Sequence, residues 1–79
     1  MKVRYIGPDI GIDGLFNGHI YEVLRVDELT GYLAVVDESG EDYLYHAQKP
    51  QAIAWRYEGG RFEIVEDDEA GSLHEAIYG

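Results

Sequence analysis

The sequence predicts an all-β protein, a small open barrel of five to six antiparallel strands, with room for a short C-terminal helix. Its apolar residues fall mostly in short runs rich in Val, Ile, Tyr and Phe, and some of these runs alternate with polar residues as half-buried strands do. Glycine-containing turns separate the runs, and two pairs of runs can be placed in register as hairpins. Short strands joined by tight turns are typical of small barrels.

The hairpin predicted over residues 32–45 organises the rest of the chain. A two-residue loop would place Asp37 opposite Asp42, and opposed like charges destabilise a ladder. A three-residue loop avoids this pair if Asp37 opens a type I turn and Gly40 ends it in the left-handed conformation. Gly40 is then hard to replace. The resulting pairs are Val35 with Tyr43, Leu33 with Tyr45, and Ala34 with Leu44.

The first strand is predicted over residues 2–6, and Gly7-Pro8 ends it because proline has no N–H to donate to the ladder. The loop over residues 9–18 is too apolar for a freely solvated linker. We expect Leu15 and Phe16 to fold back over one open end of the sheet, with Asn17-Gly18 as the turn into the next strand.

Residues 19–26 form the longest predicted strand, followed by a turn over residues 27–31. Strict alternation breaks at Val23-Leu24, where two neighbouring positions are apolar. Either both faces of the sheet are buried there, or a bulge resets the register, as happens where small barrels bend.

A polar crossover over residues 46–51, with space for one helical turn, leads into a second predicted hairpin of residues 52–57 and 61–65. Gly59-Gly60 joins its strands, since adjacent glycines tolerate the positive φ angles of a type I′ loop. The register pairs Glu58 with Arg61, Tyr57 with Phe62, Arg56 with Glu63, and Trp55 with Ile64.

From Glu66 onward the chain is acidic, and it contains a capping-box pattern at Ser72 and Glu75. This pattern predicts a short helix that ends at Gly79 and docks through Leu73 and Ile77. Disorder after residue 68 is the alternative. The predicted organisation is therefore a barrel over residues 1–66 and an acidic tail or short docked helix over residues 67–79.

Composition narrows the classes of function. The 79 residues predict one domain, and sixteen acidic against six basic residues give a net charge of −10. This charge argues against direct binding of a nucleic-acid backbone and favours either simple solubility or a basic partner. There is no cysteine for a disulfide or a thiolate metal site. With no apolar run long enough for a membrane span and no apolar secretory signal, we expect a soluble, cytoplasmic protein that does not engage membranes.

Four segments of the chain resemble a group of small, largely uncharacterised bacterial and phage-encoded SH3-like barrel proteins. They are residues 2–7, residues 17–24 with Tyr21-Glu22-Val23-Leu24, residues 37–45 with Asp37-Glu38-Ser39-Gly40-Glu41-Asp42-Tyr43-Leu44-Tyr45, and residues 62–66 with Phe62-Glu63-Ile64-Val65-Glu66. The resemblance covers about two thirds of the sequence and implies a five-stranded SH3-like barrel. It supplies no catalytic residues. Between His46 and Arg61 the chain departs from the pattern of the group, which usually passes quickly from the Tyr-Leu-Tyr strand to the Phe-Glu-Ile-Val strand. The extra segment, which contains Trp55, leaves the closing geometry of the barrel open.

Neither a metal centre nor a catalytic set is predicted, and we expect no cofactor. The three histidines, His19, His46 and His74, match no metal-ligand spacing. The acidic clusters lack the alternating ligands and central glycine of a calcium loop. With no cysteine and only Ser39 and Ser72 as serines, a nucleophile with its base is hard to assemble. We therefore expect a protein that is not an enzyme.

The ten aromatic residues exceed what so small a core obviously needs. One interpretation is an exposed patch that binds a basic or proline-containing protein partner, since SH3-like barrels bind peptides on aromatic-lined surfaces. The other is that these rings cover the core with their hydroxyls in water. The candidate patch residues are Tyr5, Tyr21, Tyr32, Tyr43, Tyr45, Trp55 and Tyr57.

The leading functional prediction is a non-enzymatic protein-interaction module that uses this patch and the acidic surface of Glu38, Glu41 and Asp42. A rival is an acidic inhibitor that mimics nucleic acid and occupies the DNA-binding groove of another protein. Homo-oligomerisation through an open strand edge is a further possibility, and residues 46–61 are where we would look for it.

Overall fold

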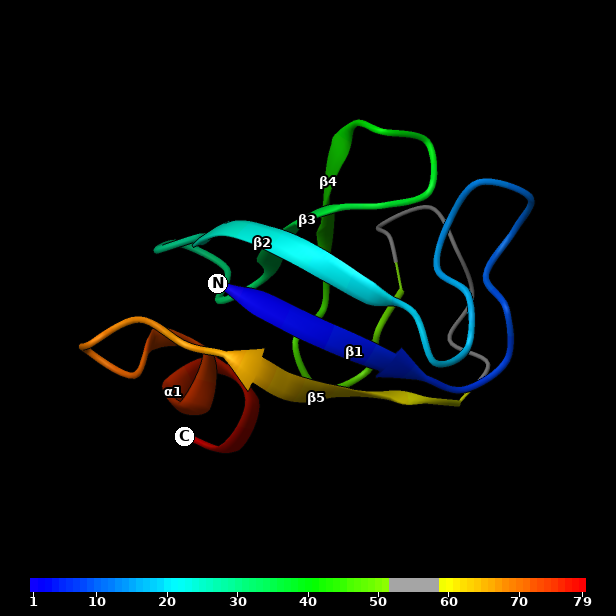
Figure 1. Cartoon of the computed structure of the whole chain (residues 1–79). Coiled ribbons are helices and arrows are strands. Elements are labelled where there is room, and N and C mark those ends of the chain that lie inside the picture. Colours follow the sequence, from blue (N-terminus) through cyan, green and yellow to red (C-terminus); the bar gives the residue numbers. More distant parts are fainter. Residues whose placement is uncertain (52–58) are drawn as a thin grey trace.

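The computed structural model describes residues 1–51 and 59–79, which form five antiparallel strands in one sheet and a short helix (Figure 1). The strands lie in the order β4-β3-β2-β1-β5. Within the described part of the chain, β4 and β5 are the two edges, so this sheet is not closed. The elements are β1 (Lys2–Ile6), β2 (Ile20–Val26), β3 (Leu33–Val36), β4 (Asp42–Tyr45), β5 (Arg61–Glu66) and α1 (Ser72–Tyr78).

The central hairpin has the predicted register. β3 and β4 pair Leu33 with Tyr45, Ala34 with Leu44 and Val35 with Tyr43. The N–H of Gly40 donates to the carbonyl of Asp37 across 3.0 Å, and Gly40 has a φ of 83°. The three-residue loop and the left-handed glycine are therefore confirmed. They follow from local turn chemistry, which the sequence displays directly.

The break in alternation along β2 is a bulge. β2 pairs Val23 with Val35 but Arg25 with Ala34, so Leu24 is the extra residue. Leu24 is 53% exposed, which makes the alternative of two buried faces wrong. A bulge increases the local twist of a strand, and here it lies where β2 passes from its pairing with β1 to its pairing with β3.

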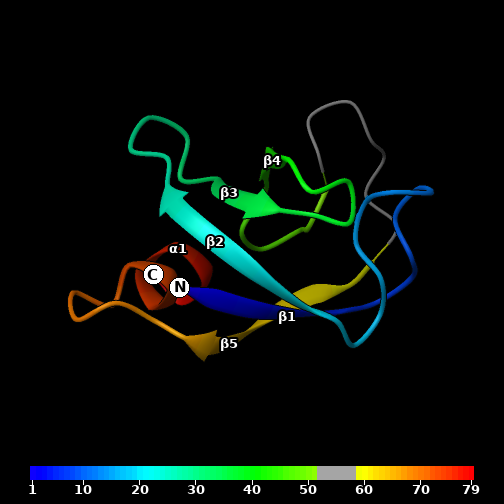
Figure 2. The same ribbon diagram turned by 45° about the horizontal axis from the view of Figure 1, so that its top comes forward.

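The loop between β1 and β2 folds back as predicted. Leu15 is fully buried, and the N–H of Ile10 donates to the carbonyl of Leu15 across 2.7 Å, which closes a small internal hairpin. At its base, the N–H of Gly18 donates to the carbonyl of Tyr5. This loop is therefore an ordered part of the molecule that lies beside the turn of the β3–β4 hairpin (Figure 2).

The crossover after β4 contains no helical turn within residues 46–51. His46 organises it instead, because its Nδ1 accepts hydrogen bonds from the backbone N–H groups of Gln48 and Lys49. The predicted strand over residues 61–65 is confirmed as β5, which pairs with β1. The predicted strand over residues 52–57, and its pairing with β5, lie outside the described residues.

The short C-terminal helix forms, but without the predicted capping box. Ser72 is the first helical residue, and Gly71 precedes it without a side-chain cap. Asp68 accepts from the N–H of Ser72, and Asp67 accepts from the N–H groups of Leu73 and His74. Aspartates that precede the helix have taken the role expected of Ser72 and Glu75, since they reach the same free N–H groups.

Alternate residues of β1, β2, β3 and β5 fill the core, and α1 covers it with Leu73 and Ile77, as predicted. α1 packs against β2 and β5 close to the start of the chain (Figure 1). In the described segments, no helix has the length and apolar character needed to cross a membrane.

Candidate functional site

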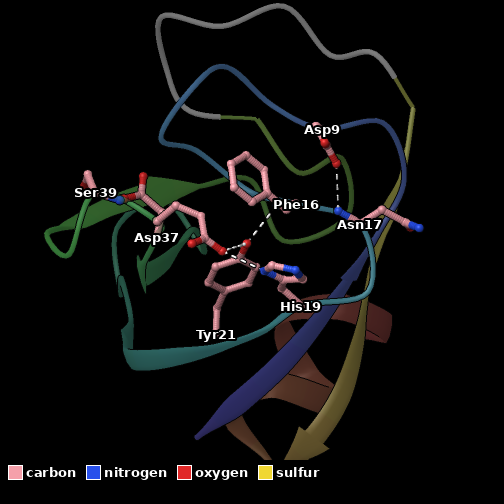
Figure 3. A network of polar contacts seen from close by, with 8 residues as sticks. Asp9, Phe16, Asn17, His19, Tyr21, Asp37 and Ser39 are labelled. Atoms are coloured by element: carbon pink, nitrogen blue, oxygen red, sulfur yellow. Dashed lines mark hydrogen bonds and ion pairs between the residues drawn. The ribbon is translucent and has the colours of Figure 1, made fainter.

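A polar network joins the loop between β1 and β2 to the turn between β3 and β4 (Figure 3). The Tyr21 hydroxyl lies at its centre: it donates to Glu38 Oε2 across 2.6 Å and accepts from the N–H of Phe16 across 2.7 Å. Tyr21 extends from the start of β2, and Glu38 is the first residue of the hairpin loop. One hydroxyl therefore connects two loops from distant parts of the sequence.

Three further contacts belong to this loop–turn junction, which we define as Gly14, Phe16, His19, Tyr21 and Glu38. The Nδ1 of His19 lies 2.8 Å from Glu38 Oε2, and the N–H of Glu38 donates to the carbonyl of Gly14 across 2.9 Å. The His19 ring also meets the Phe16 ring edge to face, with centroids 5.6 Å apart. The junction holds the loop by side-chain and backbone contacts together.

The junction alters the acidity of its members. Hydrogen bonds from Tyr21 and His19 stabilise the charged form of Glu38 and lower the pKa of its carboxyl group. Burial raises the pKa of the Tyr21 hydroxyl well above 10.0, and the bond to Glu38 raises it further. At neutral pH the bond therefore joins a neutral phenol to a carboxylate, which is a strong charge-assisted pairing.

Asp37 is buried and structural. Its Oδ2 accepts from the Tyr45 hydroxyl across 2.7 Å, and its Oδ1 accepts from both the N–H and the hydroxyl of Ser39. Burial, followed by the bond to Asp37, raises the pKa of the Tyr45 hydroxyl. Asp37 thus secures the hairpin loop from inside, and its carboxylate is fully engaged within the fold.

Beside this junction lies a concavity of about 360 Å³ between the tip of the β1–β2 loop and the β3–β4 hairpin. Its mouth carries two exposed apolar side chains, Ile12 at 89% and Tyr43 at 48% exposure. Ile10 and Tyr45, both buried, also line it. Among the described residues, each charged residue in its lining is acidic, namely Asp13 and Asp37. We call this feature the acidic concavity.

Glu41 adds a third carboxylate near the acidic concavity. Its Oε2 accepts from the Tyr43 hydroxyl across 3.0 Å, and this bond is the main reason why the pKa of Tyr43 is raised. Glu41 and Asp13 are both exposed. An apolar ring beside carboxylates can receive a cation that carries its own apolar stem, such as a Lys or Arg side chain.

Three of the described positively charged residues face carboxylates on the sheet. On β1, Lys2 lies opposite Glu22 and Glu66. Arg61 binds Glu63 across 3.1 Å, and Arg25 lies 3.9 Å from Asp42. Within residues 1–51 and 59–79, no Lys or Arg forms an ion pair with Asp13, Glu38 or Glu41. Among the described residues, Asp13, Glu38 and Glu41 therefore keep the negative charge of this loop end free of a Lys or Arg ion pair.

The expected exposed aromatic patch is not formed as a whole. Tyr5, Tyr21 and Tyr45 are buried, at 0%, 5% and 2% exposure, so they cannot contribute to an exposed surface. Their hydroxyls point to partners inside the fold, and the Tyr5 hydroxyl donates to the carbonyl of Pro8. Tyr5 and Tyr21 lie on the inward face of their strands by alternation, and Tyr45 packs inward against Asp37, so these rings fill the core of a small sheet.

The remaining aromatic candidates lie in different parts of the chain and do not form one patch in the described structure. Tyr43 is exposed at the acidic concavity, and Tyr32 is half-buried against His46 at the other end of the sheet. Trp55 and Tyr57 lie outside the described residues. Of the predicted acidic residues, Glu41 borders the concavity, Glu38 belongs to the junction, and Asp42 faces Arg25.

Sequence reasoning missed Ile12 and Asp13 as surface residues of interest. The sequence did contain a signal for the exposure of Ile12, because an isoleucine among glycines and aspartates at a loop tip has few apolar neighbours to pack against. His19, His46 and His74 stay apart, in contact with Glu38, Tyr32 and Tyr78. Among the described residues, no group of three or more His, Asp or Glu side chains is placed to hold a metal ion.

The chain matches no known family model, no curated protein and no solved structure. The class that the described residues define is a small, mostly β fold with five antiparallel strands, one short helix and an acidic loop end.

Proposed function

We propose that this protein is a non-enzymatic protein-interaction module whose acidic concavity binds a basic segment of a partner. The observation that carries the proposal is the exposure of Ile12 and Tyr43 beside Asp13 and Glu41. Burial of apolar surface would supply affinity, and the carboxylates would select a cationic partner and speed its approach. Of the aromatic patch predicted from the sequence, Tyr43 is the described ring that retains this role.

We further propose that the scaffold is an SH3-like barrel. Support comes from the strand order, in which β5 joins β1 and the β2-β3-β4 meander follows. The bulge at Leu24 adds support, because it lets β2 bend between its two neighbours. Such a scaffold leaves its loops to carry the binding residues, as the β1–β2 loop does here.

The proposal is tested by using the whole chain as bait for partner capture from lysate of the source cells, followed by identification of the bound proteins. The site variant is Asp13→Asn with Glu41→Gln. The control is Glu22→Gln with Glu66→Gln, which removes the same charge from the strands that flank β1.

A partner with a basic segment that the wild type and the control capture, and the site variant loses, supports the proposal. Recovery of the bait alone would contradict it and would point to a homo-oligomer. Equal capture by the site variant would also contradict it, because the concavity would then play no part.

A second candidate function, an inhibitor that mimics nucleic acid, is favoured by the net charge of −10 and by the carboxylates of the loop end. The loop end holds carboxylates with no Lys or Arg in a described ion pair, while the described Lys and Arg contacts lie along the sheet. A mimic should release its partner at high salt and in competition with double-stranded DNA. A module that uses Ile12 and Tyr43 should instead resist DNA and be weakened by Ile12→Ser.

A further inference from the structure

A second concavity, of about 760 Å³, lies at the other end of the sheet. Its walls come from the 27–31 turn, the start of the crossover after β4, and α1. Figure 2 shows this turn and α1 at one end of the molecule and the β1–β2 loop at the opposite end. The two concavities therefore share no lining residue. We call the second one the helix groove.

The helix groove has an exposed apolar surface. Leu24, the bulged residue of β2, is 53% exposed and lines it together with the half-buried Tyr32 and Ala76. The bulge explains this exposure, because an extra residue cannot follow the alternation that would turn it inward. The fold thus presents an aliphatic side chain where a partner can cover it.

Carboxylates lie on two walls of the groove. Glu28 comes from the turn and Glu75 from α1, and both are exposed. Asp27 and Asp68 line the same walls, but each is held by hydrogen bonds, to Thr30 and Ser72 respectively. These bonds lower the pKa of both carboxyl groups, so the walls stay negative at neutral pH.

The groove is lined by fewer positively charged groups than carboxylates. Arg25 lines it and lies 3.9 Å from Asp42. His46 also lines it, and its Nδ1 accepts two backbone hydrogen bonds. Four carboxylates face two positive groups, the Arg25 guanidinium and the Met1 α-ammonium, which lies 4.0 Å from Glu22, so the described lining of the groove is acidic on balance.

We propose that the helix groove is a second docking site, for a polypeptide segment that carries a Lys or Arg next to an apolar residue. The apolar residue covers Leu24 and Tyr32, and the cation lies between Glu28 and Glu75. The choice of occupant follows from charge complementarity across an apolar surface. This site shares no residue with the acidic concavity. The proposal can therefore be tested independently of the function proposed above.

The test is an NMR titration of the uniformly ¹⁵N-labelled whole chain with three blocked five-residue probe peptides. The first alternates Lys and Leu, the second Lys and Ser, and the third Glu and Leu. The first probe should shift the amide signals of Thr30, Gly31 and Ala76 and bind about fivefold more tightly than the second, because only it buries apolar surface. The third should not bind.

Two charge variants locate the site. Glu28→Gln with Glu75→Gln should weaken the first probe about fivefold, since two exposed ion pairs are lost. Glu63→Gln with Glu66→Gln removes the same charge from β5, outside the groove lining, and should change affinity less than about twofold. Leu24→Ser should weaken the first probe to the level of the second.

Several results would overturn the proposal. They are shifts confined to Gly11, Asp13 and Glu41, equal weakening by both charge variants, or equal affinity for the Leu and Ser probes. Shifts confined to those three residues would instead support the acidic concavity as the single site, so the failure of one proposal is distinguishable from the failure of the other. Concentration-dependent changes at Thr30 and Ala76 without any probe would assign the groove to a second copy of this chain and would also overturn it.

Discussion

The Tyr21 hydroxyl lies 2.6 Å from Glu38 Oε2 and joins the start of β2 to the turn of the β3–β4 hairpin. The same hydroxyl accepts from the N–H of Phe16. Seventeen positions separate Tyr21 from Glu38 in the sequence, so the bond forms only when the sheet has assembled. It fixes the β1–β2 loop, and with it the wall of the acidic concavity that holds Ile12 and Asp13.

Replacement of Tyr21 by Phe should destabilise the fold by about 2 kcal/mol, because it removes a charge-assisted bond and leaves the Phe16 N–H without its acceptor. Urea unfolding followed by circular dichroism measures this loss. Tyr43→Phe is the matched control, since the exposed Tyr43 hydroxyl reaches only Glu41 in the described structure, and its unfolding midpoint should stay at the wild-type value. Equal midpoints for all three proteins would show that the junction does not stabilise the fold.

Alkaline pH should weaken the fold. The pKa values of Tyr21 and Tyr45 are raised above 10.0 in the folded state, so folding keeps both phenols neutral. Their contribution is fully present below pH 10.0 and is lost progressively as pH rises from that value through the raised pKa values of the folded state, because over this range the unfolded chain ionises first. The measurement is urea unfolding at a series of alkaline pH values.

The variant Tyr45→Phe should lose stability less steeply than the wild type over the same alkaline range. The reason is that one phenol with a raised pKa no longer takes part in the linkage. If the free energy of unfolding of the two proteins falls equally steeply with pH, burial beside Asp37 does not raise the pKa of Tyr45.

Acid should release α1 from the sheet. Desolvation raises the pKa of Asp67, but bonds from the N–H groups of Leu73 and His74 outweigh it, and bonds from Ser72 lower the pKa of Asp68. Both pKa values lie below 3.8, so the stabilisation is full above that pH and is lost as pH falls through the lowered values. Amide exchange at Leu73 and His74 should therefore accelerate in acid before exchange in β3 does. Simultaneous acceleration in both elements would contradict this order.

Two glycines should differ in their tolerance of alanine. Gly40 has a φ of 83° and open space around it, so Gly40→Ala should cost about 1 kcal/mol of backbone strain. Gly60 has a φ of 106°, and a Cβ there would lie 2.8 Å from the Tyr5 hydroxyl and 2.9 Å from the carbonyl oxygen of Ile6, so Gly60→Ala should cost about 3 kcal/mol. Thermal unfolding ranks the two variants. A larger loss at Gly40 would contradict the described packing of Gly60 against β1.

Local chemistry made much of the fold predictable. The β3–β4 hairpin follows from the charges of Asp37 and Asp42 and from the position of Gly40, all within one turn. The bulge at Leu24 is visible as a break in alternation, although sequence alone left its alternative open. The helix was predicted from its apolar positions, but its cap was not, because Asp67 reaches Leu73 and His74 from outside the helix.

The candidate site was less predictable, since exposure depends on how distant segments pack. Tyr45 and Tyr43 lie two positions apart on one strand, yet Tyr45 is buried on Asp37 and Tyr43 is exposed on the edge strand near the loop end. The neighbouring sequence does not predict which of the two rings is buried. Likewise, Glu38 and Glu41 look alike in sequence, but Tyr21 and His19 engage only Glu38.

The most direct test of the central claim is partner capture by the whole chain with the apolar variant Ile12→Ser, compared with Leu29→Ser. Both side chains are highly exposed at loop tips, but only Ile12 lines the acidic concavity. The account predicts that Ile12→Ser reduces the bound partner about fivefold, through the loss of buried apolar surface, while Leu29→Ser captures as much as the wild type. Undiminished capture by Ile12→Ser, or an equal loss in both variants, would contradict a binding site at the acidic concavity.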